Sequence, residues 1–129
     1  MDYKTHVVVG TSTAIGISLA ARKYGVNIPV TGIGYVASAA FGSLLPDIDH
    51  PKSFLGNCIP EECHFIRHRT VTHGILFLAI VTILISFFSA PCGFGAFIGI
   101  LSHIILDMID NKGHGVCIMA PINYKRYKL

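Results

Sequence analysis

Charged side chains are scarce in this chain. Asp, Glu, Lys and Arg form only 13% of its 129 residues, while hydrophobic residues form 52% and the mean hydropathy is +0.60. Soluble domains carry about 25% charged residues, so the composition argues against an ordinary soluble protein. It predicts one integral membrane domain over residues 1–129. The alternative is a soluble helical bundle with a wholly apolar core.

Several catalytic and binding motifs are also missing. The sequence has no His-Glu-x-x-His helix, no Gly-x-Ser-x-Gly elbow, no phosphate-binding glycine loop followed by Lys and no dinucleotide-binding fingerprint, so these reaction classes lose support. The net charge of +3 is modest and lies mainly in the tail; we predict no nucleic-acid partner. None of the four cysteines has a standard zinc-binding spacing, and we expect free thiols.

Four apolar segments are present, separated by polar or turn-forming residues. They predict helices over about residues 6–22, 29–46, 73–90 and 93–110, with a polar loop at 47–72 and a basic tail at 111–129. Each segment is slightly shorter than the roughly 20 residues that cross hydrocarbon, so flanking residues must extend it. The first segment lacks a strongly basic start and a clear cleavage site, and we retain it as structure rather than as a signal peptide. The predicted fold is an all-α polytopic membrane bundle of about four transmembrane helices.

Lys and Arg residues set the expected orientation. Arg22 and Lys23 follow the first segment, whereas most of the 10 Lys and Arg residues lie in the loop 47–72 or in the tail. Cytoplasmic connections of membrane proteins carry an excess of these residues. We therefore predict a protein integral to the cell membrane, in contact with membrane lipids, with both termini in the cytoplasm.

Side chains that can bind metals gather on one side of this topology. Acids and imidazoles at the depth of lipid are costly and normally mark a function. With four crossings, all the candidates fall on the cytoplasmic face: His6, Asp47, Asp49, His50, His73, His103 and Asp107. The sequence therefore predicts a metal site on that face.

The first group of candidates follows the second apolar segment. Asp47 and Asp49 are two residues apart, which in an extended segment directs both carboxylates to one side. His50 adds a nitrogen ligand, and this mixture suits zinc, manganese or iron better than calcium. The alternative is an ordinary proline-rich turn at the end of a helix.

The second group lies in the last apolar segment. His103 and Asp107 have an i, i+4 spacing and share one face of a helix. The pair can chelate a metal, or Asp107 can orient the imidazole as a partner behind a ligand. The alternative is a hydrogen-bonded pair that only serves helix packing.

The third group enters the third apolar segment, at residues 68–73. Thr70 or Thr72 is placed to cap that helix, so its N-terminal dipole, Arg69 and the imidazoles of His68 and His73 would face one spot suited to an anion such as phosphate. The alternative is a solvated basic loop. His6 alone is weakly informative, and only its position on the shared face makes it a candidate ligand.

These motifs resemble the YdjM-like family of LexA-regulated, membrane-bound, metal-dependent hydrolases. The resemblance rests on Thr5-His6, residues 42–51 (GSLLPDIDHP), residues 68–73 (HRTVTH), residues 102–107 (SHIILD), Gly115-Val116 and Pro121. It covers almost the whole chain in consistent order. It implies an inner-membrane helical protein with a metal-dependent hydrolytic centre. Members often continue with further hydrophobic segments, which leaves open a minimal version, a truncation or completion as a homo-oligomer.

The leading hypothesis is therefore a membrane-embedded hydrolase with one or two divalent metal ions. The expected ligands are His6, Asp47, Asp49, His73, His103 and Asp107; zinc is preferred, with manganese, iron and magnesium as alternatives. Arg69 would hold an anionic substrate, expected to be a lipid head-group phosphoester, and His50 or His68 would act as acid or base. The alternatives are a metal transporter or sensor and a structural membrane protein without catalysis.

Overall fold

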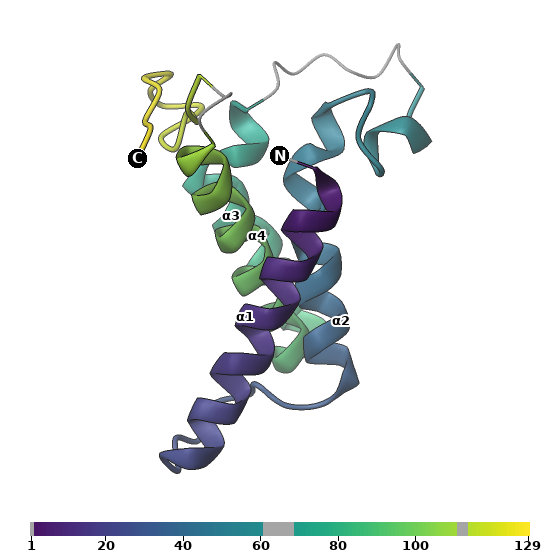
Figure 1. Cartoon of the computed structure of the whole chain (residues 1–129), viewed down its shortest axis with the longest axis vertical. Helices are drawn as coiled ribbons and strands as arrows, with labels where there is room; N and C mark the ends of the chain where they lie inside the picture. Colours follow the sequence, from purple (N-terminus) through teal and green to yellow (C-terminus); the bar gives the residue numbers. More distant parts are fainter. Residues whose placement is uncertain (1, 61–68, 111–113) are drawn as a thin grey trace.

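The computed structural model describes residues 2–60, 69–110 and 114–129, and over these it is helical, without a strand (Figure 1). The four α-helices are α1 (Tyr3–Lys23), α2 (Ile33–Gly42), α3 (Ile75–Phe88) and α4 (Ala90–Ile109). Short 3-10 turns lie between α2 and α3: η1 (Leu45–Asp49), η2 (Gly56–Cys58) and η4 (Val71–His73). The prediction of an all-helical fold is confirmed.

Helix α2 is shorter than the predicted segment 29–46. It begins after Gly32, whose φ of 90° is a left-handed conformation that breaks a helix. It ends at Gly42, and Pro46 then lies in the first turn of η1. Proline lacks an N–H group and disfavours helical backbone before it, so the last residues of the segment form a tighter turn instead. This change directs the carboxyl-rich η1 across the end of the bundle.

The reversal between α3 and α4 takes a single residue. The predicted helices 73–90 and 93–110 leave Pro91 in the connection between them, but α4 begins at Ala90, with Pro91 in its first turn, and Ser89 alone separates the two helices. The Ser89 hydroxyl accepts a hydrogen bond from the Cys92 N–H at 3.5 Å. Proline is well tolerated at the start of a helix, where its missing N–H has no partner to lose. Pro91 therefore lies within the start of α4 rather than in a separate turn.

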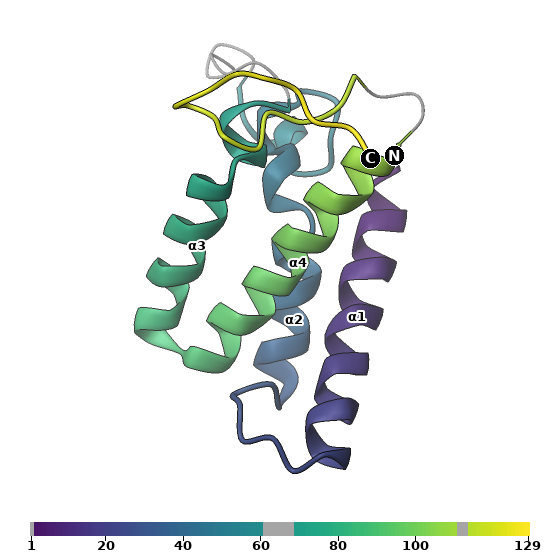
Figure 2. The ribbon, with the colours of Figure 1, turned by 90° about the vertical axis from the view of Figure 1, so that its left-hand side faces the viewer.

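Helices α2 and α4 pack closely through glycines. A Cβ at Gly95 would overlap the carbonyl of Tyr35, and one at Gly99 would overlap the carbonyl of Ala39. Such contacts are typical of membrane helices, where small residues let backbones approach. The Tyr35 hydroxyl also donates to the Ala14 carbonyl at 2.9 Å and joins α2 to α1. Helix α4 contacts α1, α2 and α3 and is the centre of the bundle (Figure 2).

Among the described helices, only α4 is long and apolar enough to cross a membrane by length and composition. It has 20 residues and a mean hydropathy of 1.8, and the apolar helix α3 has 14 residues. At about 1.5 Å per residue, 20 residues extend about 30 Å, the thickness of the hydrocarbon core, and 14 residues extend about 21 Å. By length and composition, one of the described helices, α4, is thus a candidate to cross a membrane.

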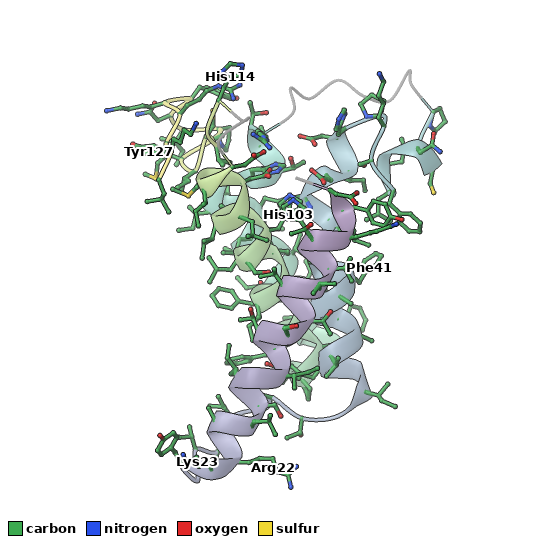
Figure 3. The ribbon with its side chains drawn as sticks, viewed as in Figure 1. Arg22, Lys23, Phe41, His103, His114 and Tyr127 are labelled. Carbon is green, nitrogen blue, oxygen red and sulfur yellow. The ribbon has the colours of Figure 1, made fainter. Side chains whose placement is uncertain are left out.

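The predicted ligand-bearing segments meet at one end of the bundle. The start of α1, the turn η1, the turn η4 and the end of α4 lie together there, with residues 114–129 nearby (Figure 1). Arg22 and Lys23 lie at the opposite end (Figure 3). The up-and-down arrangement of the helices produces this convergence.

Candidate metal centre

Four side chains converge at this end of the bundle. Asp47 comes from η1, His73 from η4, and His103 and Asp107 from α4. Each offers one ligand atom, and the four atoms lie within 4.8 Å of one another. His73 and His103 are fully buried, and Asp107 is 1% exposed. Figure 3 shows His103 directed into the space between the helices. This group could hold a metal ion.

The separations of the ligand atoms fit a single ion. The Nε2 atom of His73 lies 3.1 Å from Oδ2 of Asp107, and Nε2 of His103 lies 3.6 Å from the same oxygen. Oδ1 of Asp47 lies 3.4 Å from Nε2 of His103 and 3.9 Å from Nε2 of His73. Zinc bonds of about 2.0–2.1 Å in a tetrahedron place ligands about 3.3–3.4 Å apart. The observed values scatter around that spacing.

The orientation of His103 leaves its inner nitrogen available to a metal. Its Nδ1 lies 2.6 Å from the carbonyl oxygen of Ser43, which can only accept, so Nδ1 carries the proton and donates. Its Nε2 is then a lone pair, buried and without a hydrogen-bond donor among the described residues. A buried polar atom without a partner is costly. A cation between His103 and the carboxylates would satisfy it.

The orientation of His73 follows from a relay through Thr72. The Thr72 hydroxyl donates its only proton to Oδ2 of Asp49 at 2.7 Å, so in its 3.1 Å contact with Nδ1 of His73 it accepts. In the neutral ring Nδ1 then carries the proton, and the lone pair of Nε2 faces the acceptor-only Oδ2 of Asp107 at 3.1 Å, a contact that a cation between the two atoms would relieve. Metal-binding histidines normally donate their other N–H to such a partner. Asp49, predicted as a ligand, instead lies behind Thr72.

The two oxygens of Asp107 have different partners. Oδ2 faces His73 and His103, whereas Oδ1 accepts from Nη2 of Arg69 at 3.0 Å. Arg69 Nη2 also donates to Oδ2 of Asp110 at 3.2 Å. The arginine thus orients a carboxylate of the group, a task that the sequence did not indicate. An anionic ligand at Arg69 would have to share it with these two acids.

Arg69 is also unusual in its backbone. Its φ of 61° lies in the left-handed region, which non-glycine residues seldom adopt. Its carbonyl accepts from the Cys117 N–H at 3.2 Å, and its Nε is buried without a partner among the described residues. Strained residues of this kind concentrate at functional sites. In this conformation the Arg69 side chain reaches the carboxylates of Asp107 and Asp110.

The predicted anion pocket at the start of α3 takes a different form. The residue that precedes the helix is Gly74, without a side-chain cap, so neither Thr70 nor Thr72 caps α3. The first N–H of the helix, on Ile75, donates to the Ile118 carbonyl at 2.8 Å. The segment at Ile118 therefore occupies part of the helix N-terminus that was predicted to bind an anion such as phosphate. Thr72 is used by Asp49 and His73 instead.

The other predicted residues lie at different distances from the group. His6 is 1% exposed, its ring stacks on His103 with centroids 3.8 Å apart, and its Nε2 lies 3.6 Å from Oδ1 of Asp107. It is adjacent to the group rather than among its four members. His50 follows η1, and its N–H donates to the Asp47 carbonyl at 3.0 Å. His68 lies outside the described residues.

The protonation states of Asp47 in η1 and His73 in η4 are suited to binding a cation. Burial tends to raise the pKa of Asp47, but its interactions with the neighbouring His103 and His73 rings outweigh burial and hold the pKa below its usual value. Burial lowers the pKa of His73 below 6.5, although the nearby carboxylate of Asp107 tends to raise it. A carboxylate and a neutral imidazole are the forms that bind metals.

Comparisons with known proteins identify the family. A family profile described as "YdjM inner membrane protein" matches residues 1–129. The chain belongs to the YdjM family. The resemblance inferred from the motifs is confirmed, since the match covers the segments that carry all four residues of the candidate metal group.

Individual relatives are similar at moderate identity. An uncharacterized protein of Bacillus subtilis, YvsG, is 35% identical over 113 residues, covering 83% of this chain and 66% of that protein. The inner membrane protein YdjM of Escherichia coli, like that of Shigella flexneri, is 38% identical over 103 residues, covering 70% of this chain and 50% of that protein. The chain thus spans less than two thirds of the length of these relatives. No solved structure matches.

Proposed function

We propose that the chain is a membrane-embedded, metal-dependent hydrolase of the inner membrane, with four crossings and both termini in the cytoplasm. Asp47, His73, His103 and Asp107 hold one divalent ion. The observation that supports the metal site is the buried Nε2 atom of His103, which lies 3.4 and 3.6 Å from two carboxylates and has no hydrogen-bond partner among the described residues. Relatives named as inner membrane proteins support the location.

The number of ligands bears on the choice of metal. Four protein ligands complete a tetrahedral zinc site and leave no position for water, as in structural zinc sites. An ion with six ligands, such as manganese or magnesium, retains two positions. When bound, such an ion lowers the pKa of a water molecule and polarises the bond to be broken. Catalysis therefore favours six-coordinate ions, or zinc expanded to five ligands.

The neighbouring residues favour an anionic substrate at the membrane surface. Arg69 lies beside Asp107 with its side chain 13% exposed, and its buried Nε has no partner among the described residues. A guanidinium binds phosphate through two parallel hydrogen bonds. His6 and His50 are the described imidazoles close to the group that could transfer a proton, as His68 could from outside the described residues. The substrate proposed is a phosphoester of a lipid head group.

A structural metal site is the second candidate. The group ties η1 and η4 to α4, so an ion there would join two loops to the central helix, and a closed four-ligand shell is typical of such sites. A transporter is less well supported, since the ligands lie at one end of the bundle rather than along its axis.

Hydrolysis by purified, metal-loaded protein tests the proposal. The detergent-solubilised chain would be loaded with manganese or zinc and assayed for phosphate release from p-nitrophenyl phosphate and from phosphatidic acid. Asp47→Asn should lose activity at least about 100-fold because it removes a metal ligand. Thr82→Val is the matched control, since its buried hydroxyl has no partner among the described residues. Metal binding without hydrolysis by the wild type would leave the structural site.

A further inference from the structure

A cavity of about 270 Å³ lies between α1 and α4. Its α1 wall consists of Val9, Thr13 and Ile17, and its α4 wall consists of Phe97, Ile98, Leu101, Ser102, Ile105 and Leu106. The wall residues carry no charge, and Ser102 donates its hydroxyl to the Gly99 carbonyl at 2.8 Å. We call this cavity the α1–α4 groove.

The groove is suited to an alkyl group rather than to a polar ligand. An apolar cavity of about 150 Å³ stays dry and takes up benzene, and this one is larger. The two hydroxyls in its walls provide no site for a charged head group. In water such a groove would be an exposed apolar surface, whereas in a bilayer it is filled by lipid.

The groove begins at the level of the metal centre. His6 precedes Val9 by three residues and Thr13 by seven, so all three share one face of α1. On α4, Leu106 and Ser102 directly precede Asp107 and His103. Helix α4 diverges from α1 toward the opposite end of the bundle (Figure 2). The groove therefore extends from the ligand end toward the middle of the bundle.

Its length matches one leaflet of a membrane. From Val9 to Ile17 the helix rises about 12 Å at about 1.5 Å per residue, and one leaflet of hydrocarbon is about 15 Å thick. Large hydrophobic side chains beside the groove, such as Ile105 at 40% exposure and Phe97 at 37%, are partly open to the surroundings. A chain could thus enter sideways from the bilayer.

We propose that the α1–α4 groove binds one acyl chain of a phospholipid whose phosphate group lies at the metal centre beside Arg69. The assignment rests on the proposed function for the position of the head group. The groove supplies the apolar contact, and the metal centre with Arg69 supplies the charge complementary to the phosphate. The chain would thereby select membrane lipids over water-soluble phosphoesters.

The chain contains no tryptophan, which allows a direct test by fluorescence. Phe97→Trp places one fluorophore in the groove, and Phe87→Trp places one on the outer face of α3, where Phe87 is 89% exposed. Each variant would be titrated in detergent micelles with phosphatidic acid brominated in its acyl chains, which quenches tryptophan on contact. Thr13→Phe, combined with Phe97→Trp, fills the groove from its rim.

We expect quenching of the groove tryptophan to saturate near one lipid per chain and to fall at least fivefold with Thr13→Phe. Ile17→Phe, at the other end of the same wall, is a second filling variant in case the first is unstable. Quenching that rises without saturation and in parallel at both tryptophans indicates ordinary lipid contact and overturns the assignment. Saturable quenching in a protein without hydrolytic activity would refute the hydrolase but support lipid binding in the groove. Hydrolysis of soluble phosphoesters with parallel quenching at both tryptophans would support the hydrolase but refute lipid binding in the groove.

Discussion

Replacing Thr72 by Val should weaken metal binding without touching a ligand. The substitution keeps the shape of the side chain but removes the hydroxyl that accepts from His73 Nδ1 and donates to Asp49. His73 then loses the bond that fixes its proton on Nδ1. Removing such a partner from a metal-binding histidine normally reduces affinity about 10–100-fold, equivalent to about 1.4–2.7 kcal/mol.

The same substitution should also reduce the stability of the metal-free protein. Asp49 is 7% exposed and would lose a buried hydrogen-bond donor, which costs about 1–3 kcal/mol. Affinity would be measured by competition with a chromogenic chelator in detergent, and stability by thermal unfolding. Thr72→Ser retains the hydroxyl and should bind within about threefold of the wild type. Equal affinity of wild type and Thr72→Val would refute the relay.

Three further predictions concern packing, pH and the arginine. Gly99→Ala should lower the free energy of unfolding by about 1–3 kcal/mol because the added Cβ would overlap the Ala39 carbonyl. Gly16→Ala has open space around the added Cβ and should not destabilise α1. Thermal unfolding of the two variants tests this difference. Protonated imidazole cannot bind metal, and burial holds the pKa of His73 below 6.5. The ion should therefore be retained at pH 6.5 and above and be lost only as the pH falls further, as checked by dialysis and elemental analysis; loss above pH 7 would contradict this. At saturating metal concentration, Arg69→Gln should raise KM for an anionic phosphoester about tenfold or more in steady-state kinetics; an unchanged KM would remove Arg69 from substrate binding.

The convergence of the ligands could be predicted from the sequence because it depends on topology alone. In four apolar segments that run up and down, the end of one segment lies beside the start of the next on the same side. The grouping of Asp47, His73, His103 and Asp107 therefore follows from the order of the segments, without knowledge of side-chain positions. The i, i+4 spacing on α4 likewise directs His103 and Asp107 to one side. These four were among the six predicted ligands.

Topology alone could not predict which acids lie within the four-residue group and which lie behind it. Spacing treats Asp47 and Asp49 alike, but the 3-10 turn η1 sends one to His103 and the other to Thr72. That turn depends on Pro46 and on the packing of η1 against η4, a tertiary contact. The side chain of Thr72 was read as a cap because caps are local, whereas its actual partner is distant in the sequence.

Arg69 shows a related limit of the sequence. Its motif indicated a cation near an anion site, but the left-handed backbone and the pairing with Asp107 and Asp110 arise only when α4 ends beside η4. Lys or Arg at a loop is normally read as solvated or substrate-binding. A signal was present in the acid at position 110, one turn after Asp107.

Metal content of the purified chain tests the central claim most directly. Elemental analysis of the detergent-purified wild type, His103→Gln and the Thr82→Val control, each resupplied with divalent ions and dialysed, gives ions per chain. We predict one ion per chain in the wild type and in Thr82→Val, and less than about a tenth of that in His103→Gln at equal helical content. No ion in the wild type after resupply, or equal amounts in all three proteins, would contradict a metal centre at these residues.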